Sequence, residues 1–305
     1  MFIEQGVNPE NKFWKYILGS LLIIFTSFIG QIPLILGILY KTYTSKKAYP
    51  KNNDEVMRFL EPNLTLFLLM ISFVFTLIGI YFVVRYLHNQ TMLSVTTSRN
   101  KVDWNRVFFS FSIWGAFTIV STFLFYWYNP DDFVINFKPI PFAILVVIGT
   151  FLIPIQTTTE EYVFRGYLMQ GFANLSGNKW FPLLMTSVIF GAMHLSNPEV
   201  IKMGNIILLY YIGTGFFLGI ITLMDEGMEL ALGFHAANNL VSALLVTSDW
   251  SAFQTHSIFR DVSIPSASLD VLLPVFIIFP ILLKIFSSKY HWNNWKEKLT
   301  GKIKY

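Results

Sequence analysis

The chain has 305 residues, of which 54% are hydrophobic and 13% are charged, and its formal net charge is +4. Soluble domains are about 25% charged, so this chain has roughly half the charged side chains that a water-soluble surface requires, which argues against a soluble enzyme. Its 31 Phe, 14 Tyr and 8 Trp exclude disorder. The absence of cysteine excludes disulfides, thiolate metal sites and cysteine nucleophiles. These properties indicate a polytopic membrane protein.

Long apolar stretches recur along the whole chain. A helix that crosses the hydrocarbon core needs about 20 mostly apolar residues. Eight stretches approach this length: Ile17–Tyr40, Leu64–Arg85, Val107–Tyr126, Ile140–Gln170, Trp180–Leu195, Met203–Met224, Met228–Val246 and Leu269–Phe286. No repeat or long linker divides them. We therefore predict an all-α fold, a single membrane domain over residues 1–305 that forms one bundle of about eight transmembrane helices.

The distribution of Lys and Arg predicts the orientation of this bundle. The first stretch is too long for a signal peptide and lacks a small-residue cleavage site, so we expect an uncleaved signal anchor. Eight spans place both termini on one side, and by this count 14 of the 22 Lys and Arg residues lie there. The positive-inside rule then predicts cytoplasmic termini, although the first loop on the opposite side, Lys41–Glu61, is itself basic.

A few polar side chains lie deep inside the apolar stretches. An ionisable residue there costs about 2.5–3.5 kcal/mol on insertion scales and is a functional candidate by default. Lys15, Arg85 and Lys284 lie near span ends and can extend to the interface. Six residues are too deep for that: Glu160, Glu161, Arg165, His194, His235 and Asn239. The other histidines, His88, His256 and His291, are expected in solvated loops or tails.

The depths of the candidates agree with one another. At 1.5 Å per residue, Glu160 lies roughly 15 Å before the turn expected at Gly171–Gly177, and His194 roughly 21 Å after it. His235 lies roughly 10–15 Å past the turn expected at Asp225–Gly227. Three helices therefore bring polar groups to one level near mid-membrane, so a single site is possible.

Helical spacing predicts which candidates share a face. Glu161 and Arg165 are four residues apart, the spacing of an ion pair, and His235 and Asn239 have the same spacing. Gly191 allows another helix to approach beside His194, and the small-residue pair Gly215 and Gly219 predicts close helix packing.

Structural roles also explain some of these residues. Pro154 can open its helix, and Thr157-x-x-Glu160 then fits a capping box that restarts it. Glu161 and Arg165 can form a purely structural pair, since a carboxylate paired with Arg is a poor acid or base. The two histidines and Asn239 can join helices by hydrogen bonds. Taken together, these explanations require every deep ionisable group to reach one level by coincidence.

This set of residues suits the activation of water. Glu160 can deprotonate a water that attacks a carbonyl carbon, His194 can position that water or share the role of base, and His235 and Asn239 can donate to the oxyanion. Alternatively, Glu160, His194 and His235 can bind zinc with an open position for water. The His-Glu-x-x-His pattern of soluble zinc proteases is absent.

Three motifs carry a resemblance to a known family. Glu160-Glu161-Tyr162-Val163-Phe164-Arg165-Gly166, Phe190-Gly191-Ala192-Met193-His194 and His235-Ala236-Ala237-Asn238-Asn239 resemble, in order, the motifs of the CAAX protease and bacteriocin-processing family of intramembrane proteases. The similarity covers residues 140–246. It implies that Glu160 and His194 activate water, that His235 and Asn239 form the oxyanion site, and that Glu161 and Arg165 support the first motif.

The resemblance leaves the cofactor and the substrate open. The family is often labelled metalloprotease, yet its motifs are compatible with a metal-free glutamate mechanism, so zinc remains an alternative to no cofactor. It implies a bacterial cell membrane protein whose partners are the lipid bilayer and a peptide or membrane-protein substrate, with no nucleic acid. Peptide maturation, bacteriocin self-immunity and scaffolding of membrane signalling are all compatible with it. An ion-coupled transporter or a non-catalytic scaffold that uses the same residues is the competing hypothesis.

Overall fold

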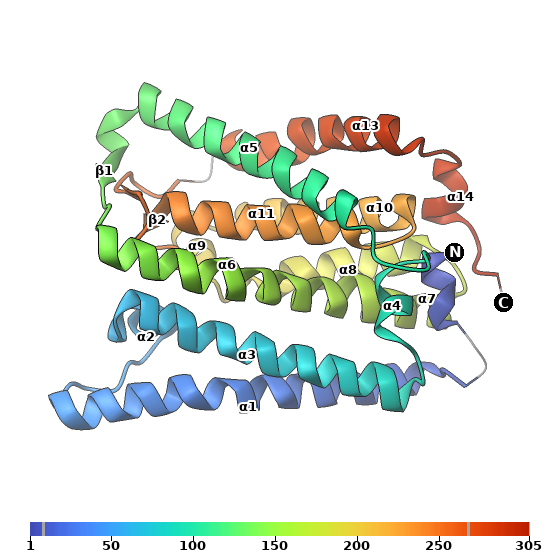
Figure 1. Ribbon diagram of the computed structural model, residues 1–305, viewed down its shortest axis with the longest axis horizontal. Helices are drawn as coiled ribbons and strands as arrows, with labels where there is room; N and C mark the ends of the chain where they lie inside the picture. Colours follow the sequence, from blue (N-terminus) through green and yellow to red (C-terminus); the bar gives the residue numbers. More distant parts are fainter. Residues whose placement is uncertain (8–9, 267–268, 305) are drawn as a thin grey trace.

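The computed structural model describes residues 1–7, 10–266 and 269–304. Its long helices lie side by side along one axis (Figure 1). The helices are α1 (Phe13–Ser45), α2 (Asn53–Phe59), α3 (Pro62–Phe82), α4 (Met92–Thr96), α5 (Trp104–Tyr128), α6 (Pro139–Glu161), α7 (Met169–Ser176), α8 (Trp180–Met193), α9 (Pro198–Met203), α10 (Ile207–Asp225), α11 (Glu229–Leu245), α12 (Leu269–Leu273), α13 (Phe279–Tyr290) and α14 (Trp295–Thr300).

Short irregular segments complete the chain. Three π-helical segments continue or join helices: η2 (Val83–Leu87), η4 (Tyr162–Leu168) and η5 (Pro274–Ile278). Two 3-10 turns are η1 (Phe2–Gly6) and η3 (Pro130–Asp132). The strands β1 (Phe133–Ile135), β2 (Val246–Ser248) and β3 (Phe259–Asp261) form a small sheet in the order β1-β3-β2, in which β3 is antiparallel to β1 and parallel to β2.

The predicted all-α membrane fold is confirmed, but the number of crossing helices differs from the prediction. Among the described residues, six helical segments are long and apolar enough to cross a membrane. They are Phe13–Ser45, Pro62–Leu87, Trp104–Tyr128, Pro139–Ser176, Ile207–Asp225 and Val271–Lys289. The other two expected spans are the shorter helices α8, of 14 residues, and α11, of 17 residues. Helix α8 is short because the chain turns at His194 and continues into α9.

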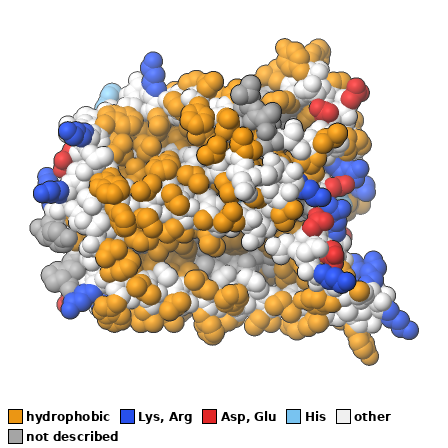
Figure 2. Space-filling model, turned by 180° about the vertical axis from the view of Figure 1, so that it is seen from behind, with side chains coloured by type: hydrophobic (Ala, Val, Ile, Leu, Met, Phe, Trp, Pro, Cys, Tyr) orange, Lys and Arg blue, Asp and Glu red, His pale blue; other side chains and the backbone are white. Residues whose placement is uncertain are grey.

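The surface of the bundle fits a bilayer. Figure 2 shows a broad band of hydrophobic side chains, with charged side chains gathered at the two ends. Lipid-facing positions on α1 illustrate the band, since Phe25 and Phe28 are more than half exposed. Such a surface is unstable in water and compatible with a hydrocarbon environment. The chain is therefore a membrane protein.

Helix α11 lies at the centre of the bundle. It packs against α5, α6 and α10, while α1 packs against α3, and α8 against α10. The last pair confirms the packing role expected of Gly215, because a Cβ atom there would come within 2.8 Å of the Ser187 carbonyl oxygen. Gly219 packs equally tightly against Leu183. Small residues thus fix the separation of α8 and α10, as is common between membrane helices.

The two termini meet at one end of the bundle (Figure 1). The backbone N–H of Lys304 donates to Glu4 (3.2 Å), and Asn178 pairs with Lys302. The buried Lys179 ammonium lies 3.7 Å from the Glu4 carboxylate. Below, this end is called the terminal end, and the end that carries α2, α9 and the small sheet is called the loop end.

The helix that carries Glu160 is not broken at Pro154, contrary to the expectation above. It continues to Glu161, and Thr157 donates its hydroxyl to the Pro154 carbonyl (3.2 Å), so no capping box forms. A threonine hydroxyl inside a helix commonly donates to a carbonyl three or four residues back. The irregularity lies after the carboxylates instead, in η4, and π-helical segments frequently mark functional sites. The expected turn at Gly171–Gly177 is also later, since α7 extends to Ser176.

His88 is not the solvated residue that was expected. Its side chain is buried at the terminal end, where Nδ1 lies 3.0 Å from Asn11 Oδ1 and Nε2 lies 3.0 Å from the Tyr167 hydroxyl. Burial lowers the pKa of His88 to about 4, so the ring is neutral at physiological pH. It joins the N-terminal segment to η4. His291 is exposed, as predicted.

Candidate active site

A cavity of about 630 Å³ lies inside the bundle. The four predicted catalytic side chains all line it: Glu160, His194, His235 and Asn239. They come from α6, from the residue after α8, and from α11. The prediction that distant helices bring these residues to one place therefore agrees with the structure.

Glu161 and Arg165 form the expected ion pair beside this cavity. Arg165 Nη1 donates to Glu161 Oε1 (2.9 Å), and both side chains are fully buried. Arg165 Nη2 also donates to the Gly215 carbonyl (3.2 Å), and the guanidinium lies over the Phe190 ring, 4.5 Å from its centre. The pair thus ties the first motif to α8 and α10.

His235 lies between the two adjacent glutamates. Its Nδ1 donates to Glu161 Oε1 (2.7 Å), and its Nε2 lies 3.5 Å from Glu160 Oε2. Because a carboxylate accepts the Nδ1 proton, Nε2 is the nitrogen available to the cavity. Glu161 therefore orients the imidazole as well as neutralising Arg165, a second role that its spacing from Arg165 did not reveal.

His194 is held in a different way, by backbone and by stacking. Its Nδ1 lies 2.7 Å from the Phe190 carbonyl oxygen, to which it donates, so Nε2 of the neutral ring is an acceptor. The ring stacks on Tyr211 of α10 with centroids 4.1 Å apart. The close approach predicted at Gly191 is present, because a Cβ there would come within 3.1 Å of the Ile212 backbone nitrogen.

A chain of side-chain amides connects Asn239 to Glu160. Asn239 Nδ2 donates to Gln156 Oε1 (3.0 Å), and Gln156 Nε2 donates to Glu160 Oε1 (2.5 Å). Behind Asn239, Asn238 Nδ2 donates to Asn239 Oδ1 (3.0 Å), and Trp114 Nε1 donates to Asn238 Oδ1 (3.1 Å). An indole only donates and a carboxylate only accepts, so the two ends of this chain fix the orientation of all three amides.

Residues outside the predicted set thus take part in the site. Gln156 has a sequence signal, since it is four residues before Glu160 on the same helix. Asn238 directly precedes Asn239 in the third motif, and its side chain donates to that of Asn239. Trp114 and Tyr211 have no local signal, because aromatic residues are common throughout the chain.

The two carboxylates differ in exposure. The Glu160 side chain is 21% exposed, whereas that of Glu161 is fully buried and paired with Arg165. Water in the cavity can therefore reach Glu160. Glu161 Oε2 is buried and has no partner among the described residues, so both contacts of this carboxylate fall on Oε1.

The zinc alternative does not fit this arrangement. Structural and catalytic zinc sites need at least three protein ligands at about 2 Å from the metal. Within the described part of the chain, no three His, Asp or Glu side chains come together in a group that could hold a metal ion. Glu160, His194 and His235 line one cavity, but they do not form such a group, and the metalloprotease label is not supported.

Comparison with known proteins agrees with the motifs. Residues 136–241 match the family model described as type II CAAX prenyl endopeptidase Rce1-like. The chain contains an Rce1-like segment. It begins just before α6 and ends within α11, so it includes all three motifs and the cavity residues that belong to them. The resemblance inferred from the motifs is confirmed.

An alignment with a relative extends beyond this segment. The chain is 27% identical over 250 residues to the uncharacterized protein YyaK of Bacillus subtilis (strain 168). The aligned residues cover 82% of this chain and 83% of the relative. No solved structure matches the chain.

Proposed function

We propose that this protein is an intramembrane endopeptidase that hydrolyses peptide bonds with a water activated by Glu160. The observation that carries the proposal is the contrast between the two adjacent carboxylates. Glu160 is the one that reaches the cavity, where His235 Nε2 lies 3.5 Å away. A general base must lie within reach of the proton that it removes, directly or through one water. The Rce1-like segment supports this class of reaction.

In the proposed reaction, Glu160 takes a proton from water as the water oxygen attacks the carbonyl carbon of the peptide. His194 accepts a hydrogen bond from the same water through Nε2. The proton then passes from Glu160 to the departing amine as the C–N bond breaks. Each positioned acid–base group of this kind contributes about 10²–10⁴-fold in rate.

The oxyanion of the tetrahedral intermediate needs hydrogen-bond donors. Asn239 Nδ2 has two N–H groups, of which one donates to Gln156, so the other is available to the cavity. His235 Nε2 donates when the ring is protonated. Because loss of one oxyanion donor costs about 10²–10³-fold in turnover, Asn239→Ala should lower kcat by that amount and leave the fold intact.

The proposal is tested by comparing cells that produce the wild type with cells that produce Glu160→Gln. Both the released peptides and the membrane proteome are measured by mass spectrometry. We expect peptides that are present with the wild type and absent with Glu160→Gln. Asp131→Asn removes an exposed carboxylate in η3; it is the control and should behave as the wild type.

Two results would contradict the proposal. A non-catalytic scaffold predicts identical peptide sets for the wild type and Glu160→Gln. An ion-coupled transporter predicts an activity that depends on an ion gradient, which dissipation of the gradient by an ionophore would reveal. For an intramembrane protease, we expect different peptide sets for the wild type and Glu160→Gln, and an activity that does not depend on an ion gradient.

A further inference from the structure

The catalytic cavity extends from the middle of the bundle toward the loop end. From Glu160 and His235, its wall continues along α11 through Ser242 to Val246, the first residue of β2. At the loop end it is lined by Asn53 and Met57 of α2, by residues 196–199 before and in α9, and by residues 251–253 after β2. Asn53 and Ser196 are exposed there. The cavity therefore opens at this end.

Direct contacts between these segments form the rim of the opening. Asn53 Nδ2 donates to the Ser196 carbonyl (3.4 Å), which joins α2 to the segment before α9. The backbone N–H of Ala252 donates to Glu199 Oε1 (2.6 Å), which joins the segment after β2 to α9. Arg58 also donates to the Asp249 carbonyl. The rim is thus built from loop-end segments that are far apart in the sequence.

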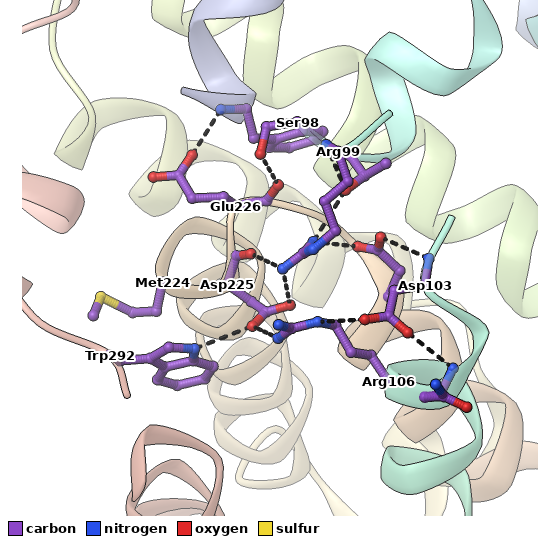
Figure 3. Close-up of polar contacts among 12 residues, drawn as sticks. Ser98, Arg99, Asp103, Arg106, Met224, Asp225, Glu226 and Trp292 are labelled. Atoms are coloured by element: carbon purple, nitrogen blue, oxygen red, sulfur yellow. Dashed lines mark hydrogen bonds and ion pairs between the residues drawn. The ribbon is translucent and has the colours of Figure 1, made fainter. Parts of the chain in front are cut away.

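The terminal end is closed by a cluster of ion pairs (Figure 3). Arg99 pairs with Asp225 (3.1 Å) and with Glu229 (3.1 Å), and Arg106 pairs with Asp103 (3.1 Å) and with Asp225. Trp292 Nε1 adds a hydrogen bond to Asp225 (3.1 Å). This cluster joins the connection between α4 and α5, the turn between α10 and α11, and the C-terminal tail.

The cluster separates the cavity from the terminal end. Among the described residues, none of 83–106, 171–180, 224–229 or 290–304 lines the cavity. Each of these segments lies at the terminal end, where the chain reverses direction or terminates. Along the axis of the bundle, a polypeptide can therefore reach Glu160 from the loop end and not from the terminal end. On its side, the cavity is also lined by Ile24 of α1, which is 51% exposed.

The Lys and Arg residues at or near the ends of the spans indicate which end faces the cytoplasm. Arg165 is buried in the site and does not count toward either end. The terminal end carries Lys12, Lys15, Arg85, Arg99, Lys101, Arg106, Lys179, Lys284, Lys289, Lys296, Lys298, Lys302 and Lys304. The loop end carries fewer: Lys41, Lys46, Lys47, Lys51, Arg58, Lys138, Lys202 and Arg260. By the positive-inside rule, the terminal end is cytoplasmic and the loop end faces outward.

We propose that the substrate enters from the outer face of the membrane and is therefore a polypeptide exposed at that face, whether released or still anchored. The identity of the substrate rests on the proposed proteolytic function. The side of the membrane to which the cavity opens is independent of that function. A cytoplasmic peptide would have to cross the bilayer before it could meet Glu160.

The direction is tested by thiol labelling, since the native chain has no cysteine. Single cysteines are placed at Ser196 on the rim, at Ser242 inside the cavity, and at Lys101 and Thr300 on the terminal end. Intact cells are treated with a membrane-impermeant, charged methanethiosulfonate. We expect Ser196→Cys and Ser242→Cys to react, and Lys101→Cys and Thr300→Cys to react only after permeabilisation.

A matched control separates access through the cavity from access through lipid. Ser121 lies in the membrane-crossing helix α5, toward the loop end, and does not line the cavity. Ser121→Cys should stay unlabelled, because a thiol in hydrocarbon is not ionised and a charged reagent does not reach it. Labelling of Lys101→Cys and Thr300→Cys in intact cells, with Ser196→Cys protected, would overturn the proposed direction.

The substrate class is tested by the origin of the peptides that depend on Glu160. All of their cleavage sites should lie in exported proteins or in outward-facing segments of membrane proteins. Cleavage sites confined to cytoplasmic proteins would overturn the inference and leave the proposed protease in place. Outward labelling without any Glu160-dependent peptide would instead overturn the proposed function and leave the direction of the cavity established.

Discussion

His235 and Arg165 donate to the same oxygen of Glu161, at 2.7 Å and 2.9 Å. The second oxygen of that carboxylate is buried, with no partner in the described part of the chain. One atom therefore couples the stability of the first motif to the orientation of the imidazole. Removal of Glu161 alone changes both properties together. Removal of Glu161 and Arg165 together should separate them, because it restores part of the stability and does not restore the orientation of the imidazole.

The pair Glu161 and Arg165 should behave as a buried ion pair. Either single change to Ala leaves an uncompensated buried charge, which costs about 3–5 kcal/mol. We expect a lower melting temperature for each single variant and partial recovery in the double variant, measured by Trp fluorescence of the purified protein. Melting temperatures that fall additively in the double variant would contradict this pairing.

The activity of the same double variant should not recover. His235 loses its Nδ1 acceptor in Glu161→Ala/Arg165→Ala, so its ring is no longer oriented toward Glu160. We expect turnover to fall roughly 10²-fold, the lower end of what a positioned acid–base group contributes. A folded double variant with wild-type turnover would show that His235 needs no acceptor.

Trp114 should affect catalysis from a distance. Trp114→Phe keeps the aromatic ring but removes the donor that orients Asn238 and, through it, Asn239 and Gln156. Loss of one hydrogen bond is worth about 0.5–1.5 kcal/mol, so kcat should fall roughly 2–12-fold with KM little changed. Trp127→Phe, at a position 81% exposed, is the control. Equal kinetics for both variants would remove Trp114 from the site.

Metal content distinguishes a glutamate base from a zinc site. The side chains that line the cavity do not form a group of three ligands within the described residues. We therefore expect purified protein to contain far less than one equivalent of zinc by mass spectrometry and to keep its activity in a chelator. One tightly bound zinc per chain, with activity lost on removal and restored on return, would refute the metal-free proposal.

Glu199 should make the stability of the rim depend on pH. Burial raises its pKa above the ordinary value of 4.5, although the backbone N–H of Ala252 opposes this shift. The folded state then holds the proton more tightly than the unfolded state. As the pH rises from about 4.5 through the raised pKa, this group lowers the free energy of unfolding, and the full cost is present above that pKa.

Glu199→Gln keeps an acceptor for Ala252 and removes the charge. We expect its melting temperature to exceed that of the wild type at pH 7, and the difference to shrink toward pH 4. Asp131→Asn, at an exposed position in η3, should show no such difference. A less stable Glu199→Gln at pH 7 would mean that the buried carboxylate has a partner that stabilises its charge.

The sequence by itself determined the properties that depend on neighbouring residues. Long apolar stretches determine the all-α membrane class, because hydrocarbon requires every backbone group to be satisfied within a helix. The four-residue spacing determined the ion pair of Glu161 with Arg165, and the motifs identified the catalytic candidates. Each of these depends on residues a few positions apart, so no tertiary information was needed.

Only the tertiary structure decided which distant groups meet. His235 is 74 residues from Glu161, and Trp114 is 124 residues from Asn238. Such contacts depend on how each helix is rotated and how deeply it lies, which is fixed by close packing at residues such as Gly215 and Gly191. The burial of His88 and the opening of the cavity at the loop end have the same origin. They follow from how separate segments pack, which no local pattern of hydrophobicity or spacing specifies.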